Sequence, residues 1–176
     1  MVLGTGRDDE AVRWYRRAAE AGHPEVALKL GKLFSQWGRP EAEAWLRYAS
    51  DWGDPRAANT LAIHLSGTES FDEAEVEALF RRAAEGGIRS AMVNLGALLE
   101  KEGQYAEARS WYLAAERQGY PFAARHIAQL LLTQGKEEEA ADWRRRAAAV
   151  DPEGLPESLP PPPGHTPTTP ADTVKE

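Results

Sequence analysis

WYLAAERQG, residues Trp111–Gly119, is the most informative stretch of the sequence because related copies of it recur along the chain. The copies WYRRAAEAG, WLRYASDWG, LFRRAAEGG and WRRRAAAVD begin at Trp14, Trp45, Leu79 and Trp143. Successive copies start 31, 34, 32 and 32 residues apart. A nearly fixed period of this length indicates an array of repeats.

Apolar residues at helical spacing accompany every copy. In the first copy, one face of the expected helix carries Ala11, Trp14, Tyr15, Ala18 and Ala19. Gly22 follows, and a glycine at this place can adopt the left-handed backbone that ends a helix. Extended to the whole chain, the pattern predicts helices over 8–21, 24–36, 40–53, 55–66, 72–86, 90–102, 104–118, 121–134 and 136–149.

These helices form pairs in which one helix carries a small residue and the other a bulky residue. The first helix of each pair has a small residue at its centre, at Gly31, Ala62, Gly96 and Ala128. The second carries the pattern E-A-x-x-W-x-x-x-A, whose bulky member fills the space that a small residue leaves. One pair cannot bury its apolar stripe alone, so pairs must stack. The sequence therefore predicts an all-α solenoid of about nine helices over residues 8–151.

The two ends of the chain have a different composition. Residues 1–7 are short and contain glycine, and we expect them to be frayed. Residues 152–176 hold eight of the twelve prolines and almost no large apolar side chains. Such a segment cannot bury enough surface to offset its ordering entropy, so we expect a disordered tail with polyproline II tendency at 160–163.

Composition excludes several classes of protein. The net charge of −7 and the pI near 5.2 argue against a nucleic-acid partner, which usually requires a basic face. The chain has no cysteine, which excludes thiolate catalysis and cysteine-bound metal. No apolar run approaches the ~18 residues of a membrane span. We therefore expect a cytoplasmic protein that binds neither nucleic acid nor membrane.

Charged residues also follow the repeat. A glutamate begins each second helix, at Glu10, Glu41, Glu75, Glu107 and Glu139, where a carboxylate favours the helix dipole by ~0.3–1 kcal/mol. An arginine recurs two positions after the tryptophan, at Arg16, Arg47, Arg81 and Arg145. We interpret this basic ridge as a solvated outer face rather than an anion site.

The segment NLGALLEKEGQYAEARSWYLAA, residues Asn94–Ala115, resembles a tetratricopeptide repeat. The positions that match the family pattern are Gly96, Gly103, Tyr105, Ala108, Tyr112 and Ala115. The WYxxAAExG blocks are also similar to Sel1-like repeats, the bacterial variant. The resemblance spans about residues 10–151 and implies a right-handed α-solenoid that acts as a protein-interaction scaffold. The sequence does not decide between the tetratricopeptide and the Sel1-like subfamily.

In the family that the chain resembles, the first helices line a concave groove that holds peptides. By register, the resemblance implies that the groove residues are Lys29, Lys32, Arg56, Asn59, Asn94, Arg125, His126 and Gln129. Asn59 and Asn94 stand out because an amide offers both a donor and an acceptor to a peptide backbone. Ile63 and Ala97 occupy registers where family members that bind chaperone tails carry polar groups, so we do not expect that ligand.

Catalytic and metal-binding patterns are absent from the sequence. None of the four histidines has a second histidine four residues away on a helix, and none has a recurring acidic neighbour. No serine lies in a G-x-S-x-G elbow, and there is no phosphate-binding loop. His64 shares the register of Leu33, Leu98 and Leu130, which predicts a packed histidine. We therefore predict a protein that is not an enzyme and uses no cofactor or metal.

Two functions remain open from the sequence. One is a non-enzymatic, monomeric scaffold that binds an unidentified protein or peptide in the groove. The alternative is a regulatory or sensor segment of a larger signalling or transcriptional regulator. The proline-rich tail offers a third role, as a ligand for another module, because PESLPP and PPPPGHTP contain P-x-x-P-like spacing.

Overall fold

The computed structural model describes residues 6–68 and 71–150, and within these ranges the chain forms nine α-helices joined by turns. In chain order they are α1 Gly6–Glu20, α2 Pro24–Gln36, α3 Glu41–Asp51, α4 Pro55–Ser66, α5 Glu73–Glu85, α6 Arg89–Lys101, α7 Tyr105–Arg117, α8 Ala123–Thr133 and α9 Glu137–Val150. The nine expected helices are thus confirmed, with ends that differ by at most two residues. None of the described helices is long and apolar enough to cross a membrane.

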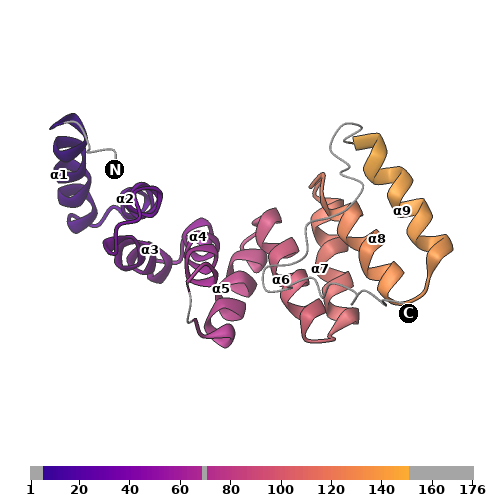
Figure 1. Ribbon diagram of the computed structural model, residues 1–176. Helices are drawn as coiled ribbons and strands as arrows, with labels where there is room; N and C mark the ends of the chain where they lie inside the picture. Colours follow the sequence, from indigo (N-terminus) through magenta and orange to yellow (C-terminus); the bar gives the residue numbers. More distant parts are fainter. Residues whose placement is uncertain (1–5, 69–70, 151–176) are drawn as a thin grey trace, which may run out of the picture.

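The helices form one extended row of antiparallel pairs, running from α1 at one end to α9 at the other (Figure 1). We call α2, α4, α6 and α8 the A helices, and α1, α3, α5, α7 and α9 the B helices. Each A helix packs on the B helix that follows it and on the B helix before it. Neighbouring A helices also touch directly, α2 with α4 and α6 with α8. The A helices therefore form the more closely packed side of an all-α solenoid.

The centre of each A helix touches a bulky residue of the following B helix. A Cβ atom on Gly31 would lie 2.6 Å from Leu46 Cδ2, and one on Gly96 would lie 2.5 Å from Tyr112 Cε1. Both distances are too short for real contacts, so only glycine permits this approach. Leu46 and Tyr112 are fully buried as a result. A small residue does face a bulky one at these two joints, but the bulky residue lies one position after the expected tryptophan, and Trp45 and Trp111 are only partly buried.

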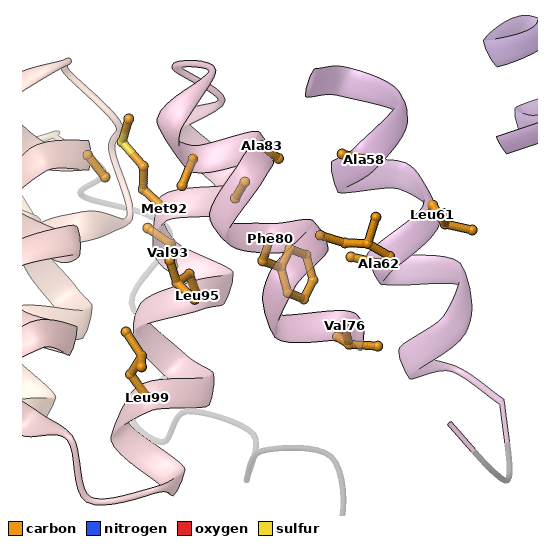
Figure 2. Close-up of a cluster of buried hydrophobic side chains, with 14 of the residues drawn as sticks. Ala58, Leu61, Ala62, Val76, Phe80, Ala83, Met92, Val93, Leu95 and Leu99 are labelled. Atoms are coloured by element: carbon orange, nitrogen blue, oxygen red, sulfur yellow. The ribbon is translucent and has the colours of Figure 1, made fainter. Parts of the chain in front are cut away.

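The apolar core is continuous along most of the row. One cluster of buried side chains extends from Ala19 in α1 to Ala140 in α9. Figure 2 shows its central part, where Val76 and Phe80 of α5 lie between the side chains of α4 and those of α6. Every pair therefore completes its core with its neighbours, as expected for stacked repeats.

A glycine follows the B helix at each of the four turns that join one unit to the next. Gly22, Gly53, Gly87 and Gly119 have φ values of 94°, 86°, 84° and 73°, which are left-handed. A side chain with a Cβ atom is strained in this region, so these turns require glycine. The predicted helix stops are confirmed. The expected frayed segment covered residues 1–7, but residues 6 and 7 are part of α1. Residues 1–5, the expected disordered tail and two positions of the long turn after α4 lie outside the described residues.

Candidate functional site

The A helices expose one polar surface, which we call the A face. It contains all eight residues that the resemblance assigned to a groove. Lys29 and Lys32 of α2, Arg56 of α4 and Gln129 of α8 are exposed, whereas Asn59, Asn94, Arg125 and His126 are partly buried. The eight predicted residues therefore all lie in A helices, four of them exposed and four partly buried.

One register of the A face is at least partly exposed in every unit. It contains the residue just before the Leu/Ile of the helix centre, namely Lys29, Thr60, Asn94 and His126. Within the described part of the chain, the side chains of Lys29, Asn94 and His126 form no hydrogen bond or ion pair. These three residues are therefore available to a partner.

Asn59 lies one position earlier, in a deeper register. Its equivalents Leu28 and Val93 are buried, with exposed fractions of 5% and 6%. The Asn59 side-chain oxygen is buried and accepts no hydrogen bond from the described residues. Sequence reasoning treated Asn59 and Asn94 as one pair, but the structure places them at different depths of the A face.

Arg56 is already engaged within its own helix start. Asp54 precedes α4, and its carboxylate accepts a hydrogen bond of 2.8 Å from the Arg56 backbone N–H. The Arg56 guanidinium Nη2 lies 2.8 Å from the second carboxylate oxygen. This pairing lowers the pKa of Asp54, and it leaves Arg56 less available to a ligand than Lys29 or Lys32.

A buried tyrosine forms the floor of the A face between α6 and α8. Tyr112 of α7 donates a hydrogen bond of 3.0 Å to Glu100 Oε2 of α6. Its ring stacks on His126 of α8, with centroids 5.3 Å apart and an interplanar angle of 25°. Sequence reasoning missed this cluster. Tyr112 and His126 had each been identified, but their contact depends on how α7 fits between two A helices.

Burial sets the protonation of this cluster. Burial, together with the smaller effect of the nearby Arg125 guanidinium, lowers the pKa of His126 to about 4. Burial also raises the pKa of Glu100, against the effect of its hydrogen bond from Tyr112. At neutral pH, His126 is therefore an uncharged imidazole with one donor and one acceptor nitrogen.

His64 bridges two units instead of facing a ligand. Its Nδ1 lies 3.2 Å from the Ser35 hydroxyl, which links α4 to α2. The side chain is partly buried. The described residues contain no group of three or more histidine, aspartate and glutamate side chains that could hold a metal ion.

The recurring arginines of the B helices are paired across units. Arg47 of α3 binds Glu43 in its own helix at 2.8 Å and also reaches Glu75 of α5. Arg81 of α5 contacts Glu107 of α7 at 2.5 Å. Hydrogen bonds from these arginines lower the pKa of Glu75 and of Glu107.

The interpretation of this ridge as merely solvated was therefore wrong for Arg47 and Arg81. Each side chain is partly exposed, yet it joins successive B helices. A signal was present in the sequence, because the arginine and the glutamate both recur in fixed registers. We call this row of ion pairs the B-face ladder.

Comparison with known proteins gives a consistent assignment. A tetratricopeptide repeat family model matches residues 90–117. A search of curated protein sequences gives no significant match.

Solved structures share the fold over most of the chain. MamA superposes with a TM-score of 0.67 at 20% identity, covering 87% of this chain and 98% of MamA. A Sel1 repeat protein from Oxalobacter formigenes gives 0.65 at 28% identity, covering 81% of this chain and 64% of its own.

The protective antigen c5321 of uropathogenic Escherichia coli, which has an SLR fold, gives a TM-score of 0.67 at 22% identity and covers 78% of this chain and 33% of its own. The chain therefore has the fold of tetratricopeptide and Sel1-like repeat proteins, and its residues 90–117 match the tetratricopeptide repeat model.

Proposed function

We propose that the chain is a non-enzymatic scaffold that holds an extended peptide, or an extended segment of a partner domain, on the A face. The observation that carries this proposal is a set of at least partly exposed polar side chains, Lys29, Asn94 and His126, in one register of three of the four A helices, with no hydrogen-bond or ion-pair partner among the described residues. Proteins of this repeat type are generally scaffolds that bind other proteins. Side chains that share one register of the A helices suit a ligand that runs along the solenoid.

The same reasoning supports further properties of the scaffold. The net charge of −7 favours a protein partner over nucleic acid. We place the activity in the bacterial cytoplasm and propose that the scaffold acts as a monomer without catalysis, cofactor or metal. Size-exclusion chromatography with light scattering would test the monomer, since a dimer mass at micromolar concentration would contradict it.

The decisive experiment compares two matched pairs of charge insertions in the full chain. Ile63 and Ala97 are exposed on the A face, and Ile63 exposes 50% of its surface. Ala44 and Ala78 are exposed on the B helices. A random peptide display library, selected on the unmodified chain, supplies the ligands whose affinity is then measured.

We expect Ile63→Glu with Ala97→Glu to abolish binding of the selected peptides, because two carboxylates would stand in their path. Ala44→Glu with Ala78→Glu should leave binding unchanged. All four positions are exposed, so both variants should keep the thermal unfolding midpoint of the parent within a few degrees. If the B-helix pair removes binding and the A-face pair does not, the proposed surface is wrong.

A further inference from the structure

The A face changes its chemistry along the solenoid. At the α2 end, Lys29 and Lys32 are exposed and carry no ion-pair partner among the described residues. Glu25, one turn before Lys29, has its carboxylate 3.2 Å from His23 Nδ1. The α2 section therefore offers two available ammonium groups, which attract carboxylates.

The α4 section separates the two ends and offers little charge. Arg56 is held by Asp54, and Thr60 donates its hydroxyl hydrogen to the Arg56 carbonyl oxygen at 2.8 Å. Ile63, also in α4, is exposed. A ligand that crosses this section meets an aliphatic side chain instead of an available cation.

The α6–α8 section offers neutral hydrogen-bonding groups on a rigid floor. Asn94 and His126 occupy the same register in adjacent A helices. The Tyr112 ring supports the His126 ring by stacking, and the Gly96 contact and the hydrogen bond to Glu100 hold Tyr112 in place. His126 therefore presents its ring nitrogens in a fixed orientation.

The two charged side chains of this section are each engaged within the protein. The Glu100 carboxylate lies beside Tyr112, and the Arg125 guanidinium lies over the Phe122 ring, 5.5 Å from its centroid. A ligand carboxylate placed over Asn94 and His126 would approach Glu100 and meet no unengaged ammonium group. An uncharged main chain, in contrast, matches the donor and acceptor groups of an amide and a neutral imidazole.

We infer that the A face selects a bipartite extended peptide, with its acidic residues over Lys29 and Lys32 of α2 and an uncharged stretch hydrogen-bonded by Asn94 and His126. This inference rests on the proposed function and adds the composition and placement of the ligand. Charge complementarity places the acidic end of the peptide at α2 and its uncharged end at α6 and α8. The Tyr112 floor makes His126 a specificity-determining residue for the uncharged end.

The test uses the full chain and a display library of random twelve-residue peptides with blocked ends. The unmodified chain should select peptides with aspartate or glutamate at one end and uncharged residues at the other. Lys29→Glu with Lys32→Glu should replace the acidic preference by lysine or arginine and leave the uncharged end as it was. Lys136→Glu with Arg144→Glu, two exposed positions off the A face, makes the same change in net charge and should alter nothing.

A second pair of variants tests the uncharged end. His126→Phe keeps a ring that can stack on Tyr112 but loses both nitrogens, so it should weaken a selected peptide about tenfold, which is the effect of one lost hydrogen bond in a partly buried site. His126→Gln, which keeps a neutral donor and acceptor, should recover part of that loss. Neither change should alter the preference for acidic residues at the other end.

The outcomes separate the inference from the proposed function. If peptides bind the A face but the acidic preference survives Lys29→Glu with Lys32→Glu, or His126→Phe binds as tightly as the parent, the bipartite ligand is wrong and the scaffold stands. If the unmodified chain selects no peptide, or binding survives Ile63→Glu with Ala97→Glu, the groove itself is wrong. An acidic preference at both ends would also overturn the bipartite ligand.

Discussion

The two long faces of the solenoid use their charged residues differently. On the B helices, Arg47 and Arg81 each reach a glutamate of the next unit. On the A helices, Lys29 and Lys32 reach none among the described residues. Recurrence of a charge is therefore not a sign of binding in this molecule. Arg47 and Arg81 join successive units, whereas Lys29 and Lys32 are left for a ligand.

Tyr112→Ala should have the largest effect, because this side chain touches the core and the A face together. The ring is fully buried, and its loss should lower the free energy of unfolding by ~3–5 kcal/mol. Chemical denaturation of the full chain measures the change. Tyr112→Phe, which loses only the hydrogen bond to Glu100, should lower it by ~1 kcal/mol. Equal losses in the two variants would mean that the hydroxyl, and not the ring, supports the site.

Stability should fall in acid because of His126. Its folded-state pKa of about 4 is below the ordinary value of 6.5, so the unfolded chain binds more protons between these pH values. Stability contributed by the neutral ring is present above pH 6.5 and is lost as pH falls toward 4, by up to about 3 kcal/mol.

The raised pKa of Glu100 acts in the opposite direction, since ionisation of this carboxyl destabilises the fold as pH rises. The measurement is therefore the difference between the parent and His126→Gln in denaturation curves from pH 7.5 to 4.5. A difference that does not vary with pH would show that the imidazole titrates normally, and that the A face is charged near pH 6.

The B-face ladder should contribute less than the Tyr112 joint. Arg81 and Glu107 expose 33% and 38% of their side chains, so water and salt screen the pair. We expect a coupling free energy of ~0.5–1 kcal/mol from a double-mutant cycle of Arg81→Ala and Glu107→Ala. The coupling should shrink in 1 M salt, at which the Debye length is about 3 Å. A coupling free energy of zero at low salt would mean that the B-face ladder does not stabilise the contacts between units.

Asn59→Ala and Asn94→Ala should have the smallest effects on stability, and they should differ in binding. The Asn59 oxygen is buried without a hydrogen-bond partner, so its removal should change stability by less than ~0.5 kcal/mol or increase it. Asn94→Ala should leave stability unchanged and weaken the selected peptides. If Asn59→Ala weakens binding more than Asn94→Ala, the deeper register is the one that ligands reach.

The sequence was sufficient for the helices because their determinants are local. Apolar spacing, prolines at helix starts and glycines at helix stops all act within one turn of helix. Gly31 and Gly96 also predicted the tight joints, since a small residue opposite a bulky one leaves one reasonable arrangement. The same register brought the expected groove residues to one face.

Contacts between units were harder to predict. The pairing of Arg47 with Glu75 spans 28 residues, and it depends on how far one unit is displaced from the next. The stacking of Tyr112 on His126 depends on the rotation of α8 relative to α7.

The B-face ladder runs in one direction, from an arginine in one unit to a glutamate in the next. A unit such as residues 54–87 takes part in two of these ion pairs. Its Glu75 pairs with Arg47 of the preceding unit, and its Arg81 pairs with Glu107 of the following unit. If this unit were duplicated in tandem, the first copy's Arg81 would meet the second copy's Glu75, and no existing pair would lose its partner. The solenoid can therefore be lengthened by recombination without redesign of its joints, while each new unit is free to place a different side chain on the A face.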